Sequence, residues 1–524
     1  MNKERAAWKK YLLTAAVAFI LGLLPYFVLL VSTGAEELSV GQYVRGVSEW
    51  LWGLAARYAP HILTLYILSV AVLIFLEGQN PDRTVMWLLV LALLPVFGVA
   101  LYLILGPDLR RMKTRKLFKP TKAYPTIVTP REKRIPPGIR KISVLAFRSG
   151  GAEIMERGEV RILIDGAETF GAITEALNDA KRYINIEYFI FKDDRIGTEI
   201  ADILCCKAED GVKVRMIVDG VGSWKIGRKL IKRLQASGVD FRSFMPVSFP
   251  SLRSGINYRN HRKIVVVDGD VAFTGGLNVG VEYLGEGKLG NWRDTHAGFR
   301  GEVVYALNTV FLEDWAIASG EELSPNLEEF APTRPDACAD MPFLPVQVVA
   351  SGSGAPWHSI EQMYFEMITE ADKRIWITSP YLVPDEAILE ALRVSALSGV
   401  DVRILIPEKS DHFLVYWAGR SNIENLLRAG VRIWSYKKGF VHAKTLLMDD
   451  TIASVGTANL DNRSLEINFE VQTFIYDRKT CADFTEQFLK DIEDADERML
   501  SEWERRPFWQ RVLESLGRLW SAQI

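Results

Sequence analysis

The 524-residue sequence has few cysteines, few histidines and almost no net charge. Its four cysteines, Cys205, Cys206, Cys338 and Cys481, have neither metal-ligand spacing nor the pattern of a disulfide framework, and they fit a reducing compartment. The formal net charge of −2 excludes a general affinity for polyanions, so any attraction to phosphate must come from local patches. Because the whole chain holds only six histidines, two of them in matching contexts are informative.

Apolar residues are concentrated in the first hundred positions. The uncharged run 11–32 is long enough to cross a bilayer as a helix, 61–76 is marginal, and 85–106 is long enough. The connector 77–83 holds an Asn-Pro-Asp sequence that suits a turn between antiparallel spans. We therefore expect a transmembrane region over residues 1–109 with two or three spans, although the first run could instead be a removable signal peptide.

A strongly basic stretch, which includes Arg110, Lys116 and Lys122, lies within the juxtamembrane linker 110–141. Basic flanks favour the cytoplasmic side of a membrane, so we expect the part of the chain that follows to be cytoplasmic. The N-terminal flank, with Lys9 and Lys10, is also basic, and three spans cannot place both flanks on one side. The number of spans and the side of the N-terminus therefore stay open.

Beyond residue 141 the sequence alternates apolar helical segments with short β-rich runs, and this pattern occurs twice. Residues 173–191 have the same layout as 362–383, and 210–220 correspond to 398–408. A duplicated α/β sandwich is the natural interpretation.

The pattern predicts four successive parts after the linker. They are a first domain over 142–324, a linker over 325–345, a second domain over 346–500 and an amphipathic helix over 501–524. The apolar face of that last helix could touch the membrane, but helical periodicity favours packing against the core of the protein.

Each copy contains the motif H-x-K-x4-D and, 17 residues after its histidine, an asparagine in a small-residue turn. Lysine supplies positive charge and asparagine an amide donor, so two copies facing each other form a pocket for one phosphate between two histidines. A single H-x-K would more often be a surface feature, but the paired motif favours catalysis. We expect no metal and no cofactor, because no ligand cluster accompanies the histidines and two lysines can offset the phosphoryl charge. The candidate catalytic and phosphate-binding residues are His261, Lys263, Asp268, His442, Lys444, Asp449, Asn278 and Asn459.

These motifs resemble the phospholipase D superfamily, and the wider context is similar to the bacterial cardiolipin synthases over nearly the whole chain. The resemblance rests on segments such as RNHRKIVVVDG, FTGGLNVGVEYL, WRDTH, VHAKTLLMDD and VGTANLDNRSLEINFE. It implies an α/β fold with N-terminal transmembrane helices followed by two tandem phospholipase D-like sandwich domains and a pseudo-two-fold active site. It also implies a multi-pass protein of the bacterial inner membrane.

The resemblance further implies transfer of a phosphatidyl group from one phosphatidylglycerol to another, giving cardiolipin and glycerol through a phosphohistidine. The expected partners are these phospholipids and membrane lipids and not nucleic acid, while the oligomeric state, with a homodimer among the alternatives, stays open. A hydrolase or a transphosphatidylase with another acceptor alcohol would use the same residues. A nuclease and a non-catalytic scaffold are less attractive, because the membrane region ties the site to lipid and both motifs are intact.

The resemblance also implies an acidic residue behind each histidine, and Asp294 and Glu470 are the best matches. A carboxylate that accepts a hydrogen bond from one ring nitrogen fixes the tautomer and leaves the other nitrogen for chemistry. The resemblance favours His261 as the nucleophile and His442 as acid and then base. The charges of Arg259, Arg262 and Lys263 next to His261 point the same way, because cations should keep that ring neutral, whereas His442 has less positive charge nearby.

Overall fold

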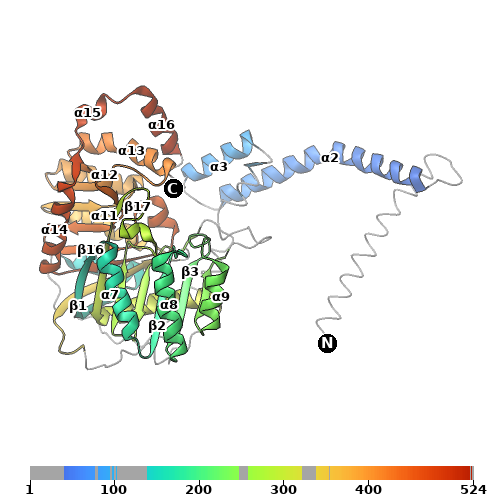
Figure 1. Ribbon diagram of the computed structural model, residues 1–524. Coiled ribbons are helices and arrows are strands. Elements are labelled where there is room, and N and C mark those ends of the chain that lie inside the picture. Colours follow the sequence, from blue (N-terminus) through green and yellow to red (C-terminus); the bar gives the residue numbers. More distant parts are fainter. Residues whose placement is uncertain are drawn as a thin grey trace. The chain divides into compact units, whose positions relative to one another are not determined.

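The computed structural model describes residues 40–76, 81–94, 97–98, 102, 139–246, 258–321, 338–352, 355–519 and 521. The chain forms two compact units, Met1–Gly106 and Pro107–Ile524, and Figure 1 gives the element labels used below.

In the first unit, α2 (Val40–Leu76) and α3 (Pro81–Leu93) contact each other, and Trp87 and Leu91 of α3 are buried against Ile67 of α2. The predicted connector thus lies between two contacting helices, and its last three residues, 81–83, already belong to α3. None of the helices among the described residues combines the length and hydropathy needed to cross a bilayer. The run 11–32 and the basic stretch 110–122 lie outside the described residues, so the predicted spans and orientation stay predictions.

The second unit contains one mixed sheet of 15 strands, which consists of two halves with the same strand order. From the central neighbours β9 and β1, the strand order runs β18, β16, β15, β10, β12, β13 in one direction and β8, β6, β5, β2, β3, β4 in the other, and β19 adds an outer edge to the second half. Within this sheet, every strand of the first half thus has a counterpart at the same place in the second. The duplication predicted from the sequence is confirmed.

The halves have the following element bounds. The first half contains β1 (Ile154–Ile164), α7 (Asp165–Asp179), β2 (Tyr183–Tyr188), α8 (Arg195–Glu209), β3 (Lys213–Asp219), α9 (Arg228–Ala236), β4 (Asp240–Phe244), β5 (Ile264–Val267), β6 (Val271–Gly275), a 3-10 turn (Val281–Leu284), β7 (Asn291–Arg293), β8 (Thr295–Gly301) and α10 (Glu302–Ser319). The second contains β9 (Phe343–Ser351), α11 (Ser359–Glu370), β10 (Arg374–Thr378), β11 (Leu382–Val383), α12 (Glu386–Leu397), β12 (Asp401–Pro407), α13 (Phe413–Arg428), β13 (Arg432–Tyr436), β14 (Gly439–Val441), β15 (Thr445–Met448), β16 (Ile452–Gly456), β17 (Leu460–Asp461), a π-helical turn (Arg463–Ile467), β18 (Glu470–Ile475), α14 (Arg478–Glu493), β19 (Ala495–Glu497), α15 (Leu500–Glu504) and α16 (Phe508–Leu519).

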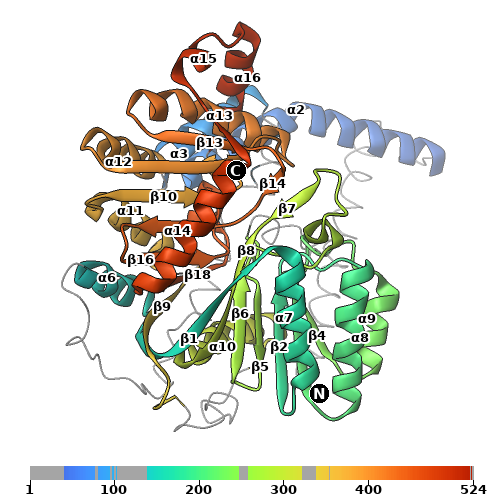
Figure 2. The ribbon, with the colours of Figure 1, turned by 60° about the vertical axis from the view of Figure 1, so that its left-hand side comes forward.

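Three apolar clusters hold these layers together. One spans both halves and includes residues of α10 and α14, a second lies under α7, α8 and α9, and a third lies under α11, α12 and α13. Figure 2 shows the last two helix groups well separated in space. The strands of the core are apolar on both faces, as in β5, where all four residues are buried, because helices cover both sides of the sheet.

Two predicted domain boundaries need correction. The helix α6 (Arg140–Gly150) precedes the first half, but its buried Ile142 and Ala146 pack in the core of the second half with α11. The linker predicted over 325–345 also overlaps β9, which pairs with β18 and β1 at the centre of the sheet. Both differences arise because the apolar faces of these segments find partners far away in the sequence, which local patterns do not reveal.

Candidate active site

Each motif histidine is anchored to the backbone of the opposite half. The His261 N–H donates to the carbonyl of Phe469 at 2.9 Å, and the His442 N–H donates to the carbonyl of Arg293 at 2.7 Å. His442 follows β14, which pairs in parallel with β7 of the first half, and Asn260 forms a parallel bridge with Phe469. The two halves therefore exchange short strand pairs at the site.

This exchange places each histidine beside a carboxylate of the other half. His261 Nδ1 lies 2.9 and 3.0 Å from the two carboxylate oxygens of Glu470, and His442 Nδ1 lies 2.7 Å from Asp294 Oδ2. Both carboxylates are completely buried. With Nδ1 of each ring held by a carboxylate, Nε2 is left for a reacting group. The sequence singled out these four residues but gave no indication that the pairs cross.

The two lysines of the motifs are buried with the histidines. Lys263 Nζ donates to the backbone carbonyl of its own motif histidine, His261, at 2.5 Å. Lys444 Nζ likewise donates to the carbonyl of His442 and also lies 2.8 Å from His442 Nδ1. Burial lowers the pKa of Lys263 to about 7, with the charge of Lys444 adding to the effect, and it lowers the pKa of Lys444 to about 8. The nearby carboxylates oppose the lowering in both lysines. An incoming phosphodiester anion would restore their full charge.

Burial also determines the protonation of the histidines. It lowers the pKa of His261 to about 4, with Lys263 adding to the effect and Glu470 opposing it. The pKa of His442 falls well below its ordinary value, first through burial and then through the charge of Lys444. Without substrate, both rings are therefore neutral near pH 7. A neutral ring can attack phosphorus, and a bound phosphate anion favours protonation of the second ring.

The charge argument made from the sequence for His261 holds for Lys263, whose charge lowers the pKa of that ring, but not for the two arginines. The guanidinium of Arg259 binds Asp219 at 3.2 Å, and that of Arg262 binds Asp314 at 2.5 Å, so both arginines are neutralised by buried carboxylates. The cation that contacts a histidine ring is instead Lys444 at His442. Arg259 and Arg262 are close to His261 in the sequence, but their charged groups bind other residues in the structure.

The aspartates of the motifs, predicted to be catalytic, bind the backbone elsewhere. The Asp268 carboxylate accepts hydrogen bonds from the N–H groups of residues 181, 182 and 183 at 2.7 to 2.8 Å. Asp449 does the same with residues 372, 373 and 374 at 2.8 to 3.2 Å. Both aspartates have a positive φ, of 56° and 51°, at the far end of the strand that follows the lysine. The prediction therefore needs correction: these carboxylates fix the turn before the neighbouring strand.

The two predicted phosphate-binding asparagines differ in their contacts. Asn278 Oδ1 accepts from the N–H of Ile190 at 3.0 Å, and its Nδ2 donates to the hydroxyl of Tyr283 at 3.2 Å. Asn459 is also buried, but its Oδ1 has no hydrogen-bond partner among the described residues. The Asn459 side chain therefore has a free hydrogen-bond acceptor among the described residues.

Several residues at the site were missed in the sequence. Aromatic rings flank the histidines: Phe189 lies edge-on to His261 at 4.8 Å between ring centroids, and Trp292 lies 5.2 Å from His442. The Tyr283 hydroxyl lies 3.5 Å from His442 Nδ1. His296 is buried with neither ring nitrogen hydrogen-bonded in the described part of the chain, and burial lowers its pKa to about 3. Three of them, Tyr283, Trp292 and His296, lie in the segments FTGGLNVGVEYL and WRDTH, which carry the resemblance, whereas Phe189 lies in neither of these two.

In the part of the chain that the structure describes, no group of three or more histidine, cysteine, aspartate or glutamate side chains could hold a metal ion. The groups at the site are thus two neutral imidazoles, two buried carboxylates and two lysines of lowered pKa, which suits nucleophilic and acid–base chemistry on a phosphate ester.

Comparisons with known proteins agree with this chemistry. Residues 173–315 and 364–492 match the family described as "Cardiolipin synthase, PLD-like domain", and residues 64–107 match "Phospholipase_D-nuclease N-terminal". A cardiolipin synthase of Halalkalibacterium halodurans is 41% identical over 93% of this chain and 97% of its own. Cardiolipin synthase 2 of Bacillus anthracis is 42% identical over 88% of this chain and 90% of its own. In fold, the chain is similar to a phosphatidylserine synthase of Haemophilus influenzae, with a TM-score of 0.57 at 15% identity over 73% of this chain and all of that one.

Proposed function

The chain belongs to the cardiolipin synthases of the phospholipase D superfamily, and from this premise we propose how its residues convert two phosphatidylglycerols into cardiolipin and glycerol. It is a phosphatidyltransferase, and phospholipids are its substrates. The observation that carries the mechanism is the pair of crossed contacts, His261 with Glu470 and His442 with Asp294.

In the first step, Nε2 of neutral His261 attacks the phosphorus of one phosphatidylglycerol. The bond from phosphorus to the headgroup glycerol oxygen breaks, and protonated His442 gives its Nε2 proton to that oxygen. Glycerol leaves and the phosphatidyl group remains on His261. The attack places positive charge on the His261 ring, and the ionised Glu470 carboxylate at its Nδ1 stabilises that charge.

In the second step, the roles of acid and base reverse at His442. Its ring, now neutral, removes the proton from the terminal glycerol hydroxyl of a second phosphatidylglycerol, and the oxygen attacks the phosphorus on His261. The phosphorus–nitrogen bond breaks, cardiolipin forms and His442 is protonated again. Lys263 and Lys444, with Asn278 and Asn459, stabilise the non-bridging phosphate oxygens in both steps.

His261 is the better nucleophile because the two carboxylates differ. Burial would raise the pKa of Glu470, but the charges of His261 and Lys263 and its hydrogen bonds lower it overall. Burial raises the pKa of Asp294 to about 6, against the opposing charge of Lys444. Glu470 is thus the stronger counter-charge for a phosphorylated imidazolium.

The enzyme is associated with the bacterial membrane through its family. The finer arrangement that we propose is a multi-pass N-terminal region in the inner membrane with the catalytic halves in the cytoplasm. The basic stretch 110–122 supports this orientation. If a cysteine introduced near Lys116 reacts with an impermeant reagent outside intact cells, the orientation is wrong.

Product analysis tests the function. Purified enzyme supplied with labelled phosphatidylglycerol alone should produce cardiolipin and glycerol in equal amounts. Phosphatidic acid as the main product would mean that water takes the place of the second lipid, and the proposed transfer would be refuted.

A further inference from the structure

The C-terminal helix α16 turns its polar side toward the protein and its apolar side outward. Its two buried residues are Glu514 and Gly517, and the Glu514 carboxylate accepts hydrogen bonds from Arg420 at 3.2 Å and Arg506 at 2.9 Å. The outward residues are 40 to 81% exposed, and they are Phe508, Trp509, Val512, Leu516 and Leu519. Packing of the apolar face against the core, which the sequence favoured, is therefore wrong. A helix in contact with water alone normally has the reverse arrangement.

The neighbouring helix α13 extends this apolar area. A Cβ at Gly517 would lie 2.6 Å from the backbone nitrogen of Ala418, so only glycine allows α16 to approach α13 this closely. Trp509 of α16 lies 5.8 Å from Trp417 of α13 between ring centroids, and Figures 1 and 2 show the helices side by side. The first turn of α13 adds Phe413 and Leu414, which are 66% and 47% exposed. We call these two residues and the five of α16 the α13–α16 surface.

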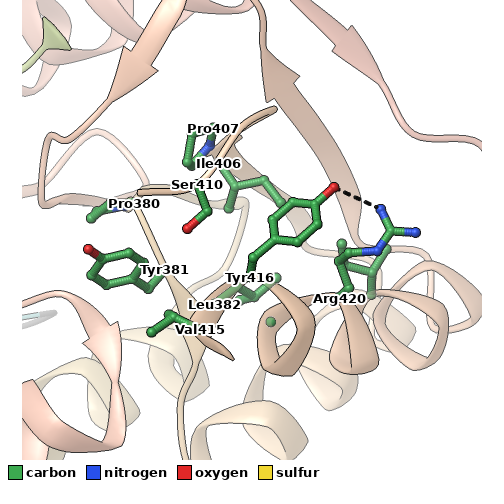
Figure 3. A pocket seen from close by; sticks show the side chains of 11 residues that line it. Pro380, Tyr381, Leu382, Ile406, Pro407, Ser410, Val415, Tyr416 and Arg420 are labelled. Carbon is green, nitrogen blue, oxygen red and sulfur yellow. Dashed lines mark hydrogen bonds between the residues drawn. The ribbon is translucent and has the colours of Figure 1, made fainter. Parts of the chain in front are cut away.

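The α13–α16 surface lies next to the active site. Beyond the end of α16, the Ser521 carbonyl accepts a hydrogen bond from Asn462 at 3.1 Å, three residues after Asn459. At the start of α13, the Asp411 carboxylate accepts one from the Tyr381 hydroxyl at 3.0 Å, and its charge opposes the lowering of the pKa of His442. Figure 3 shows the pocket there, which Tyr381 and Ser410 line together with Tyr416 and Arg420 of α13.

We propose that the α13–α16 surface docks on an anionic phospholipid bilayer and presents the active site to lipid headgroups. Both exposed charged residues of α16, Arg511 and Arg518, are basic and complement an anionic headgroup layer. Outward tryptophan and phenylalanine beside leucine suit the boundary between headgroups and acyl chains. The choice of lipid as the partner rests on the proposed function, whose substrates lie in such a layer.

The test uses a fluorophore attached to one cysteine of the full chain in phosphatidylglycerol vesicles. Cys206 and Cys338 are first replaced by serine, while Cys205 and Cys481 are buried. Leu519→Cys is compared with Leu397→Cys on α12, since these leucines are 71% and 72% exposed. With brominated acyl chains, a fluorophore at 519 should lose about half of its emission or more, and one at 397 almost none.

Two other results would overturn the docking proposal. Equal quenching at both positions, or none at 519, would place α16 outside the bilayer. In detergent, the cysteine at 519 could instead become less reactive toward a thiol reagent as the protein concentration rises. Such protection, without quenching by lipid, would assign the surface to a second copy of the chain.

Activity separates this proposal from the proposed function. The variant L516E/L519E should lower the ratio of cardiolipin synthesis from bilayer lipid to that from dispersed short-chain phosphatidylglycerol about tenfold, whereas L397E should leave the ratio unchanged. An unquenched but active enzyme refutes the docking alone. An enzyme that is quenched at 519 but makes no cardiolipin from either lipid refutes the proposed function alone.

Discussion

The two histidine sites come from matching segments of the two halves, yet their carboxylates have different surroundings. Glu470, beside His261, also accepts hydrogen bonds from the hydroxyl of Thr457 at 2.6 Å and from the amide of Asn468 at 3.2 Å. Asp294, beside His442, accepts one from the N–H of Thr295 at 2.7 Å. The same motif thus supports two acids of different strength, and in the proposed mechanism this difference would let one histidine hold phosphorus while the other moves protons.

The difference originates at one position of the duplicated turn, where Gly276 corresponds to Thr457. A Cβ at 276 would lie 2.0 Å from Asp294 Oδ1, so the space that the Thr457 side chain fills in one half is occupied by the carboxylate in the other. One half thus combines the shorter acid, Asp294, with Gly276, and the other half combines the longer acid, Glu470, with Thr457. They give equivalent geometry at the histidines but unequal charge stabilisation.

Replacing each histidine by glutamine tests the division of labour with the largest effect. Both variants should lose cardiolipin synthesis by about four orders of magnitude. A phosphatidyl ester whose leaving group needs no proton, such as nitrophenol, should restore release of that group in a single turnover for His442→Gln but not for His261→Gln. If His261→Gln releases it as well as His442→Gln does, His261 is not the nucleophile.

Substitution of the two carboxylates should have the next largest effect on activity. Glu470→Gln and Asp294→Asn keep the shape of each side chain but remove the negative charge that holds the histidine, so kcat should fall about 100- to 1,000-fold. Glu470→Gln should mainly slow formation of the covalent intermediate, measured by rapid quenching with labelled lipid. A fall below threefold in both variants would show that neither carboxylate acts through its histidine.

Removal of the Thr457 hydroxyl tests the difference between the two carboxylates through the pH dependence of kcat. Because the pKa of Glu470 is lowered in the fold, its ionised form is present above that pKa and is lost as pH falls through it. Thr457→Val removes a hydrogen bond to the charged form and raises this pKa, so the acidic limb of the kcat profile should move to higher pH and kcat should fall about tenfold. Ser454→Ala is the control: it removes another buried hydroxyl of the same sheet and should leave the acidic limb of the kcat profile in place. An unmoved limb in Thr457→Val would refute the role of this bond.

The motif aspartates should affect stability more than catalysis. Asp268→Asn and Asp449→Asn each weaken three hydrogen bonds to a turn, which should cost about 1–3 kcal/mol of unfolding free energy. Asp268 is the more buried of the two, so its substitution should be the more costly. Denaturant unfolding measures both. Preserved stability with a thousandfold loss of kcat would restore the catalytic role predicted from the sequence.

The sequence predicted what repeats locally. The two helix–strand units and the hairpins after His261 and His442 follow from spacing and turn residues that occur twice. The candidate carboxylates Asp294 and Glu470 came only from the resemblance to the family. The crossing of the histidine pairs could not be predicted, because it depends on β14 pairing with β7 across about 150 residues of chain.

Two of the wrong predictions, on the arginines beside His261 and on the face of α16, have a common physical cause. Arg259 and Arg262 lie beside His261 in sequence, but buried Asp219 and Asp314 attract their guanidinium groups. Likewise, the apolar face of α16 turns outward because Glu514 binds two arginines on the protein side. Ion pairs of buried carboxylates decide these orientations, and three of the four join segments far apart in the sequence.

The central claim, that His261 carries phosphorus while His442 carries the proton, is tested most directly by locating the covalent adduct. Enzyme mixed with labelled phosphatidylglycerol is quenched under alkaline conditions, which preserve a phosphoramidate, and its peptides are analysed by mass spectrometry. The account predicts a phosphatidyl group on the peptide that contains His261 and none on the one that contains His442. An adduct on the His442 peptide alone would contradict it.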